Sequence, residues 1–118
     1  MVNLLVDEAF AFDYLAILKL KVDKGYMDKD ATRDSFNYVK EQVGEKLFNK
    51  IIKSDQFKNL YDANSVTFDA VDAAKEDKML ASEVDKTNYF RMVAKKELQR
   101  HFFNTELQEV KIGYERLK

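Results

Sequence analysis

The stretch Ala9–Leu18 (AFAFDYLAIL) holds nine apolar or aromatic side chains and a single charge, Asp13. On an α-helix these residues span about 15 Å and are apolar around the whole circumference, whereas a surface helix needs only one apolar stripe. The helix expected at about residues 3–23 therefore has two stripes. The first consists of Leu4, Ala11, Leu15, Leu18 and Val22, and the second of Val6, Phe10, Asp13, Ile17 and Leu20. We expect this helix to be central, with one stripe in its own bundle and the other against a further surface.

The composition predicts an all-α fold. The chain has 118 residues, no Pro and only three Gly, which is fewer turn-forming residues than a β-rich domain of this length needs. Charged residues make up 35% of the chain, so it is typical neither of a disordered nor of a membrane protein. Its length fits a single helical domain over residues 1–118.

Apolar periodicity predicts further helices after the first. The expected elements are helices at about residues 29–53, 66–80 and 86–117 and a short helical turn near 55–61. Gly25 is placed to end the first helix as a left-handed cap. Gly44 lies inside the second helix, where it costs about 1 kcal/mol relative to Ala. It either admits a close neighbouring helix or marks a weak point, and its position beside the apolar stripe favours the close approach.

Composition and motifs exclude several classes of function. With 20 basic and 21 acidic residues the net charge is -1, so the protein as a whole does not attract nucleic acid. The chain has no Cys, which excludes disulfides, thiol catalysis and thiolate metal sites. Its only His, His101, follows Glu97 by four residues rather than three, so the Glu-x-x-His motif of di-metal bundles is missing. No phosphate-binding loop, dinucleotide motif or serine elbow occurs, and we expect no cofactor, no metal and no catalytic residue.

The apolar run near the start is too short to span a bilayer. The acidic residues Asp7, Glu8 and Asp13 are also wrong for the charged start of a signal peptide. We therefore expect a cytoplasmic protein that does not contact a membrane.

Asp13 is the residue whose surroundings matter most. Its neighbours three and four positions away are all apolar: Ala9, Phe10, Ala16 and Ile17. A desolvated carboxylate without a partner costs several kcal/mol or takes up a proton. If the stripe is buried, a cation, a Tyr hydroxyl or a helix N-terminus from elsewhere must meet Asp13. The preferred interpretation is a structural polar contact; an acid–base or ligand-binding carboxylate and an interface residue that sets register are the alternatives.

Charge is segregated in the second half of the chain. Residues 62–85 hold seven acidic residues against Lys75 and Lys78, and residues 86–101 hold five basic residues against Glu97. A basic face with phosphate-binding potential is formed by Arg91, Lys95, Lys96 and Arg100. The preferred interpretation is that the acidic third helix and the basic fourth helix lie antiparallel and neutralise each other.

The sequence thus predicts a compact bundle of four main helices and a non-enzymatic function in interaction or assembly. Burying the large side chains of the opening run would contribute on the order of 7–15 kcal/mol, so one stripe should not face water. We expect a homodimer through the second stripe, Val6, Phe10, Asp13, Ile17 and Leu20, since two-fold dimers are the commonest assembly. An unknown protein partner is a further option. The chain's own C-terminal segment could cover the stripe instead, through Leu107, Val110, Tyr114 and Leu117. Nucleic-acid binding by the basic face is the alternative function, and a small-molecule or enzyme site at Asp13 is a third.

Overall fold

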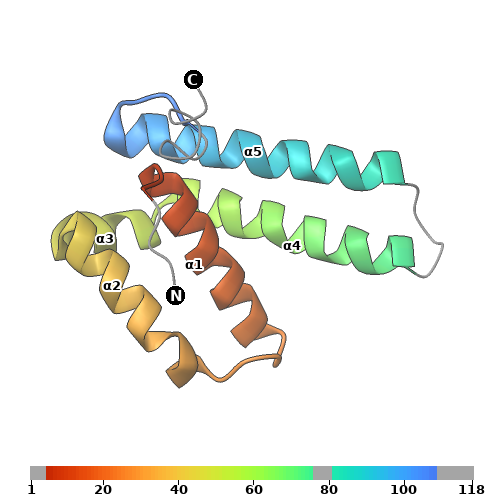
Figure 1. The fold of residues 1–118 in the computed structure, drawn as a ribbon, viewed down its shortest axis with the longest axis horizontal. Coiled ribbons are helices and arrows are strands. Elements are labelled where there is room, and N and C mark those ends of the chain that lie inside the picture. The colour runs from red at the N-terminus through yellow and green to blue at the C-terminus, as the bar shows by residue number, and fades with distance from the viewer. Residues whose placement is uncertain (1–4, 76–80, 109–118) are drawn as a thin grey trace.

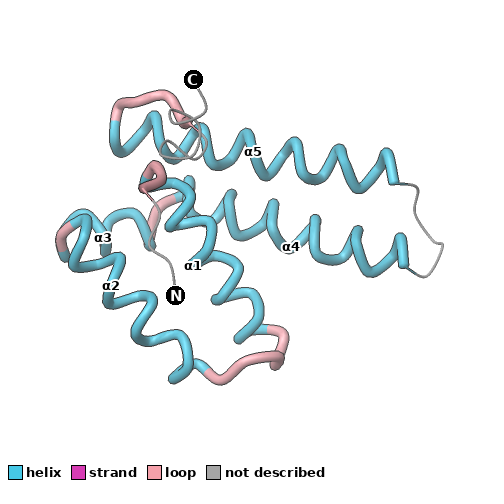
Figure 2. The backbone as a smooth tube through the Cα atoms, in the orientation of Figure 1, coloured by secondary structure: helices cyan, strands magenta, loops and turns pink. Residues whose placement is uncertain are grey.

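The computed structural model describes residues 5–75 and 81–108, and within these residues the protein is all-α. Short loops connect the helices (Figure 2), and none of the described helices is both long and apolar enough to cross a lipid bilayer. The elements are α1 (Glu8–Asp23), the 3-10 helix η1 (Lys29–Thr32), α2 (Arg33–Val43), α3 (Glu45–Ile52), α4 (Asp55–Lys75) and α5 (Ala81–Phe103). The predicted all-α bundle is confirmed, although the bounds of its helices differ from those expected.

Helix α1 is the central element of the fold. Helices α4 and α5 lie side by side as a long antiparallel hairpin, and α1 packs against both of them (Figure 1). Helices α2 and α3 lie on the other side of α1. The fold therefore uses both stripes of α1, one toward α2 and α3 and one toward the hairpin.

The core forms around Phe12, whose side chain is fully buried. Its ring centroid lies 5.9 Å from that of Phe48, and 6.5 Å from those of Phe57 and Phe103. These rings come from α3, α4 and the end of α5, so one side chain of α1 joins three other helices. Such aromatic contacts add about 0.5–1.5 kcal/mol each beyond the area that they bury.

The C-terminal end of α1 agrees with the prediction, whereas its start differs. The helix begins at Glu8 rather than near residue 3, and residues 1–4 lie outside the described part of the chain. At its end Gly25 has a φ of 79°. The Gly25 N–H donates to the Val22 carbonyl at 3.0 Å, and the Tyr26 N–H donates to the Lys21 carbonyl at 2.9 Å. This pair of bonds is a Schellman motif, which confirms the predicted glycine cap.

The helix predicted at residues 29–53 is broken at Gly44. This glycine has a φ of 94° and a ψ of 141°, and it separates α2 from α3. Before it, η1 opens the segment, with the Asp28 carboxylate accepting from the Asp30 N–H at 3.1 Å. A Cβ at Gly44 would meet nothing within 4 Å, so the glycine is present for its backbone conformation. The prediction of a close helix approach is wrong, and the weak point is the correct alternative.

Helix α4 is one continuous helix where the sequence predicts two separate elements. The predicted turn near 55–61 and the predicted helix at 66–80 form one helix over Asp55–Lys75; residues 76–80 are outside the described chain. Its start is held by Ser54, whose hydroxyl accepts from the Phe57 N–H at 3.1 Å. Asn64 and Thr67, residue types that often begin helices, lie in the middle of α4 and are buried.

Helix α5 begins and ends earlier than predicted. It starts at Ala81 rather than residue 86, so Thr87 lies inside the helix, where its hydroxyl donates to the Val84 carbonyl at 2.6 Å. It ends at Phe103, followed by Asn104 with a φ of 53°. The helix predicted at about residues 86–117 is thus wrong for residues 104–108, and residues 109–118 lie outside the described chain.

Candidate functional site

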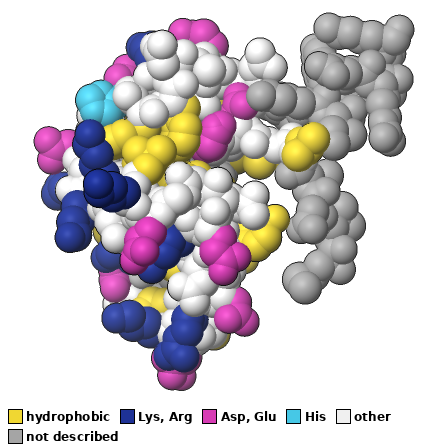
Figure 3. All heavy atoms as spheres, turned by 90° about the vertical axis from the view of Figure 1, so that its left-hand side faces the viewer, with side chains coloured by type: hydrophobic (Ala, Val, Ile, Leu, Met, Phe, Trp, Pro, Cys, Tyr) yellow, Lys and Arg dark blue, Asp and Glu magenta, His cyan; other side chains and the backbone are white. Residues whose placement is uncertain are grey.

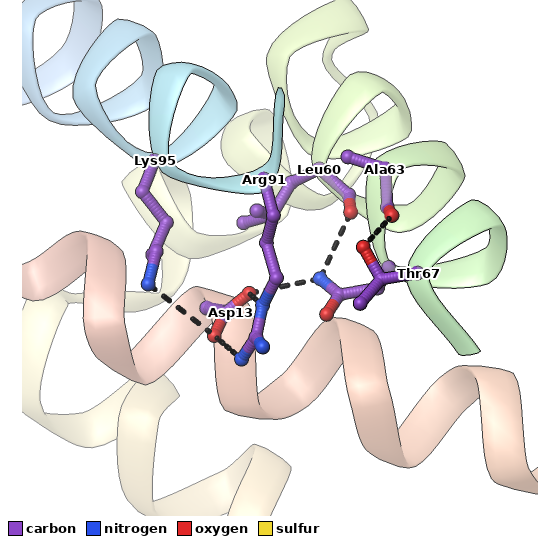
Figure 4. Close-up of polar contacts among 7 residues, drawn as sticks. Asp13, Leu60, Ala63, Thr67, Arg91 and Lys95 are labelled. Atoms are coloured by element: carbon purple, nitrogen blue, oxygen red, sulfur yellow. Dashed lines mark hydrogen bonds and ion pairs between the residues drawn. The ribbon is translucent and has the colours of Figure 1, made fainter. Parts of the chain in front are cut away.

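Asp13 lies in a cluster of buried polar side chains between α1 and the α4–α5 hairpin (Figure 4). Its residue exposure is 5%. The Arg91 guanidinium donates through Nε to Oδ1 at 3.1 Å and through Nη2 to Oδ2 at 2.6 Å. The Asn64 side-chain amide donates to Oδ1 at 2.8 Å and also to the Leu60 carbonyl at 2.9 Å. Both carboxylate oxygens are therefore bound by donors from the same chain.

A second cation completes this cluster. The Lys95 Nζ lies 4.0 Å from Oδ2 of Asp13 and 4.9 Å from the ring centroid of Phe10. Lys95 lies one helical turn after Arg91, so both point from the same side of α5 toward α1 (Figure 4). A carboxylate held by two cations and an amide fixes how α1 lies on the hairpin, because moving any of these helices would leave a buried charge unpaired.

The second stripe of α1 is covered within the chain. Asp13 and Leu20 are buried, at 5% and 3% exposure, and Val6, Phe10 and Ile17 are half-buried. The cover is supplied by α4 and α5, and of the C-terminal residues considered for this role only Leu107 lies in the described chain, where it packs against the core. Two of the residues predicted for a dimer interface, Asp13 and Leu20, are therefore buried within a single chain.

A further polar contact, which the sequence analysis does not anticipate, ties the start of α1 to the end of α5. The side chain of Gln99 is fully buried. Its Oε1 accepts from the Ala9 N–H at 2.9 Å, and its Nε2 donates to the Thr105 hydroxyl at 2.8 Å. The Asp7 carboxylate accepts from the Gln108 N–H at 2.6 Å. A glutamine of α5 thus satisfies one of the free N–H groups that open α1, and no spacing rule identifies such a long-range cap.

The basic face predicted on the fourth helix is divided by the fold. Arg91 and Lys95 point toward Asp13 and are 27% and 10% exposed in their side chains. Lys96 and Arg100 are exposed, and Arg100 lies 3.7 Å from the carboxylates of Glu97 and Glu106. The four cations therefore do not form one surface. The antiparallel placement of α4 and α5, which the sequence analysis prefers, is confirmed (Figure 1).

The opposite side of the hairpin carries exposed apolar side chains, which we call the outer face: Val66, Tyr89, Phe90 and Val93. They are 54%, 66%, 60% and 37% exposed, in that order. At about 100° per residue, Val66 lies about 200° from Asn64 around α4, Tyr89 and Val93 lie about 200° from Arg91 around α5, and Phe90 lies about 100° from Arg91 at the side of this face. Since Asn64 and Arg91 face α1, the outer face points away from α1.

The outer face is one patch across both helices. Val66 lies nine residues before the end of α4, and Phe90 lies nine residues after the start of α5. Because Asn64 and Arg91 both bind Asp13 and the two helices are antiparallel, Val66 and Phe90 lie at a similar level of the hairpin. The rings of Tyr89 and Phe90 contact each other, with centroids 6.2 Å apart.

Acidic and basic side chains are interspersed at the end of the molecule shown in Figure 3, around a smaller group of hydrophobic side chains. No group of three His, Asp or Glu side chains suited to a metal ion occurs in residues 5–75 and 81–108. Comparisons of the chain with models of protein families, with curated proteins and with solved structures find no match.

Proposed function

We propose that this protein is a non-enzymatic helical interaction protein that forms a two-fold homodimer through the outer face of its α4–α5 hairpin. The observation that carries the proposal is the cluster of exposed Val66, Tyr89, Phe90 and Val93. Single exposed apolar residues are normal on a soluble protein, whereas a contiguous patch marks an interaction site. Asp13 supports a non-enzymatic role, since its oxygens are bound by Arg91 and Asn64 in a structural contact.

The size of the outer-face side chains favours association over exposure to water. Burying a large aromatic or aliphatic side chain contributes about 1.5–3 kcal/mol relative to leaving it exposed. Tyr89 and Phe90 are the side chains with the most to gain, because aromatic residues commonly dominate the binding energy at the centre of an interface. A second copy offers the same apolar patch and can bury both at once.

Charge selects the arrangement of the two copies. Asp62, four residues before Val66 on α4, is exposed and pairs with Lys58 of its own helix at 3.0 Å, whereas Asp69 is held by Lys24 at the end of α1 at 3.1 Å. Exposed lysines, Lys86 and Lys96, flank the apolar residues of α5 on the same side. A two-fold axis parallel to the helices would place α4 of one copy on α5 of its partner, where Asp62 lies near the partner's Lys96. An axis across the helices would instead place acidic α4 on acidic α4.

Sedimentation velocity of the full chain tests the dimer. We expect a dimer at tens of micromolar protein and a monomer for Phe90→Glu, because the new carboxylate would be buried against an apolar patch. The matched control is Tyr38→Glu, which alters an exposed aromatic residue of α2 that is 54% exposed and off the outer face; it should remain dimeric. A monomer at high micromolar concentration, or a dimer that Phe90→Glu does not weaken, would overturn the proposal.

A charge exchange tests the arrangement. Asp62→Lys and Lys96→Glu should each weaken the dimer about three- to tenfold, and the double variant should recover most of the loss, because the pair is restored with its signs reversed. Losses that simply add in the double variant would contradict the pairing of α4 with the partner's α5.

Duplex DNA distinguishes this proposal from the nucleic-acid alternative. A dimeric interaction protein should not bind DNA in a salt-dependent manner. If binding weakens steeply with salt and is lost on Lys96→Gln and Arg100→Gln, the exposed remainder of the basic face carries the function instead.

A further inference from the structure

A groove lies between the second half of α1, η1 and the first half of α2, far from the outer face of the hairpin. Its volume is about 460 Å³, within the range of about 300–1,000 Å³ that small-molecule sites occupy. Its apolar surfaces come from four elements and consist of Val22, Phe36, Ile52 and Phe57. Phe57 is buried and the other three are half-buried, so the groove is open to water over an apolar floor.

The rim of the groove carries an unbalanced positive charge. Of its charged residues, Lys19 pairs with Asp23 at 3.1 Å and Arg33 pairs with Asp30 at 2.7 Å. Lys29 is the remaining charge of the rim. The two carboxylates already have cationic partners, so the surplus charge at the rim is that of Lys29.

The groove continues into a second hollow of about 340 Å³ with which it shares Lys19, Ile52 and Phe57. Tyr61 lines this hollow, and its hydroxyl donates to Asp23 at 2.7 Å. That bond, and after it burial, raise the pKa of Tyr61 to about 12. Of the three residues that the two hollows share, Ile52 and Phe57 are apolar, so a linear apolar chain can pass from one hollow into the other.

We propose that this groove is a binding site for a small linear amphiphile with one anionic head, such as a medium-chain carboxylate. The chain lies over Val22, Phe36, Ile52 and Phe57, where it covers apolar surface that the fold leaves open. The head lies at Lys29, the cation whose charge the rim does not balance. This site is separate from the dimer interface, so the two proposals stand or fall independently.

Isothermal titration calorimetry with octanoate, octanol and octyltrimethylammonium tests the site. We expect octanoate to bind in the micromolar to low millimolar range, octanol more weakly, and the cation at least tenfold more weakly than octanoate. Asn37→Trp should abolish octanoate binding, because Asn37 is exposed and lines the groove, so an indole there fills it without disturbing the core. The control is Gln42→Trp, an exposed position on the other side of α2, which should keep the affinity.

Lys29→Glu tests the head group. It should weaken octanoate about three- to tenfold and leave octanol unchanged. Sedimentation of Asn37→Trp should still give the same oligomer as the native chain. No heat with octanoate at millimolar concentration, binding that Asn37→Trp leaves intact, or equal affinity for the anion and the cation would overturn the proposal.

Discussion

Surface helices usually turn apolar side chains toward the core and charged side chains toward water. The two faces of the α4–α5 hairpin depart from this arrangement. The inner face, toward α1, carries Arg91 and Lys95, and both approach Asp13. The outer face carries Phe90 and Val93, which are 60% and 37% exposed. On α5, two cations thus lie on the inner face beside the buried Ala94 and Leu98, while large apolar side chains are exposed on the outer face.

The difference shows what each face requires. The inner charges are complete within the chain, because α1 supplies a carboxylate and α4 an amide at hydrogen-bond distance. The outer apolar patch has no such complement in the described residues, and we propose that a second copy of the chain covers it. The inner face should therefore determine the stability of the monomer, and the outer face should determine its association.

The largest expected effect is the loss of Asp13. Asp13→Ala leaves Arg91 and Lys95 beside each other without their carboxylate, and removing one partner of a buried charge pair costs about 3–5 kcal/mol. Urea unfolding at low protein concentration measures this change. The control is Glu41→Ala, an exposed position of α2, which should change the free energy of unfolding by less than about 0.5 kcal/mol. A loss below about 1 kcal/mol for Asp13→Ala would show that the inner cluster does not stabilise the fold.

A smaller loss is expected at the other inner contact. Gln99→Leu removes the acceptor of the Ala9 N–H and the donor to Thr105, and an unsatisfied buried group costs about 1–3 kcal/mol. Hydrogen exchange distinguishes this from a general packing defect, because the Ala9 amide should exchange faster than the other amides of α1. Uniformly faster exchange along α1 would instead indicate loss of the whole helix.

A contact of the inner face that is exposed to water should contribute less to the free energy of unfolding. Tyr61 of α4 donates to Asp23 of α1 at 2.7 Å, and the Asp23 side chain is 45% exposed. The hydrogen bonds from Tyr61 and then from Lys19 lower the pKa of Asp23. Tyr61→Phe should cost at most about 1 kcal/mol at neutral pH, because an exposed contact is screened by water.

The contribution of the contact between Tyr61 and Asp23 to stability should be lost both at low pH and at high pH. A carboxyl whose pKa is lowered by folding adds stability above its ordinary pKa, and this is lost as the pH falls through the lowered value. For Tyr61, raised to about 12, the contribution is complete below the ordinary phenol pKa near 10 and is lost as the pH rises toward 12. The stability difference between the native chain and Tyr61→Phe should therefore be largest between about pH 5 and 9 and close at both extremes. A difference that does not vary with pH would show that the hydroxyl acts only through packing.

The fold class follows from the sequence because composition and the paired stripes of the first helix act over many residues. The helix bounds are harder to predict from the sequence, because residue types that often begin helices also form contacts in the middle of them. Asn64 and Thr67 are residue types that begin helices, yet here Asn64 binds Asp13 and Thr67 donates to the Ala63 carbonyl at 2.9 Å in mid-helix. Gly44 shows the reverse case: the apolar stripe continues on both sides of this glycine, but the helix ends there.

The surroundings of Asp13 are only partly predictable. The lack of a cation in its own helix correctly requires a partner from elsewhere. Sequence spacing could not identify Arg91, 78 residues away, because that pairing depends on how α1 lies across the hairpin. The exposed basic face is misjudged for the same reason: its spacing is helical, but the side facing inward is decided by Asp13 on another helix.

The outer face should show the smallest effect on monomer stability. Phe90→Ser and Val66→Ser alter side chains that are 60% and 54% exposed, so each should change the free energy of unfolding by less than about 0.5 kcal/mol when the protein is dilute enough to be monomeric. At higher concentration the native chain should gain stability with concentration and Phe90→Ser should not, since only an associating species is stabilised by mass action. Urea titrations at two protein concentrations measure both quantities. A loss above about 1.5 kcal/mol in the dilute monomer would place Phe90 in the packing of the hairpin itself, and the division between an inner face that folds the chain and an outer face that associates would then fail.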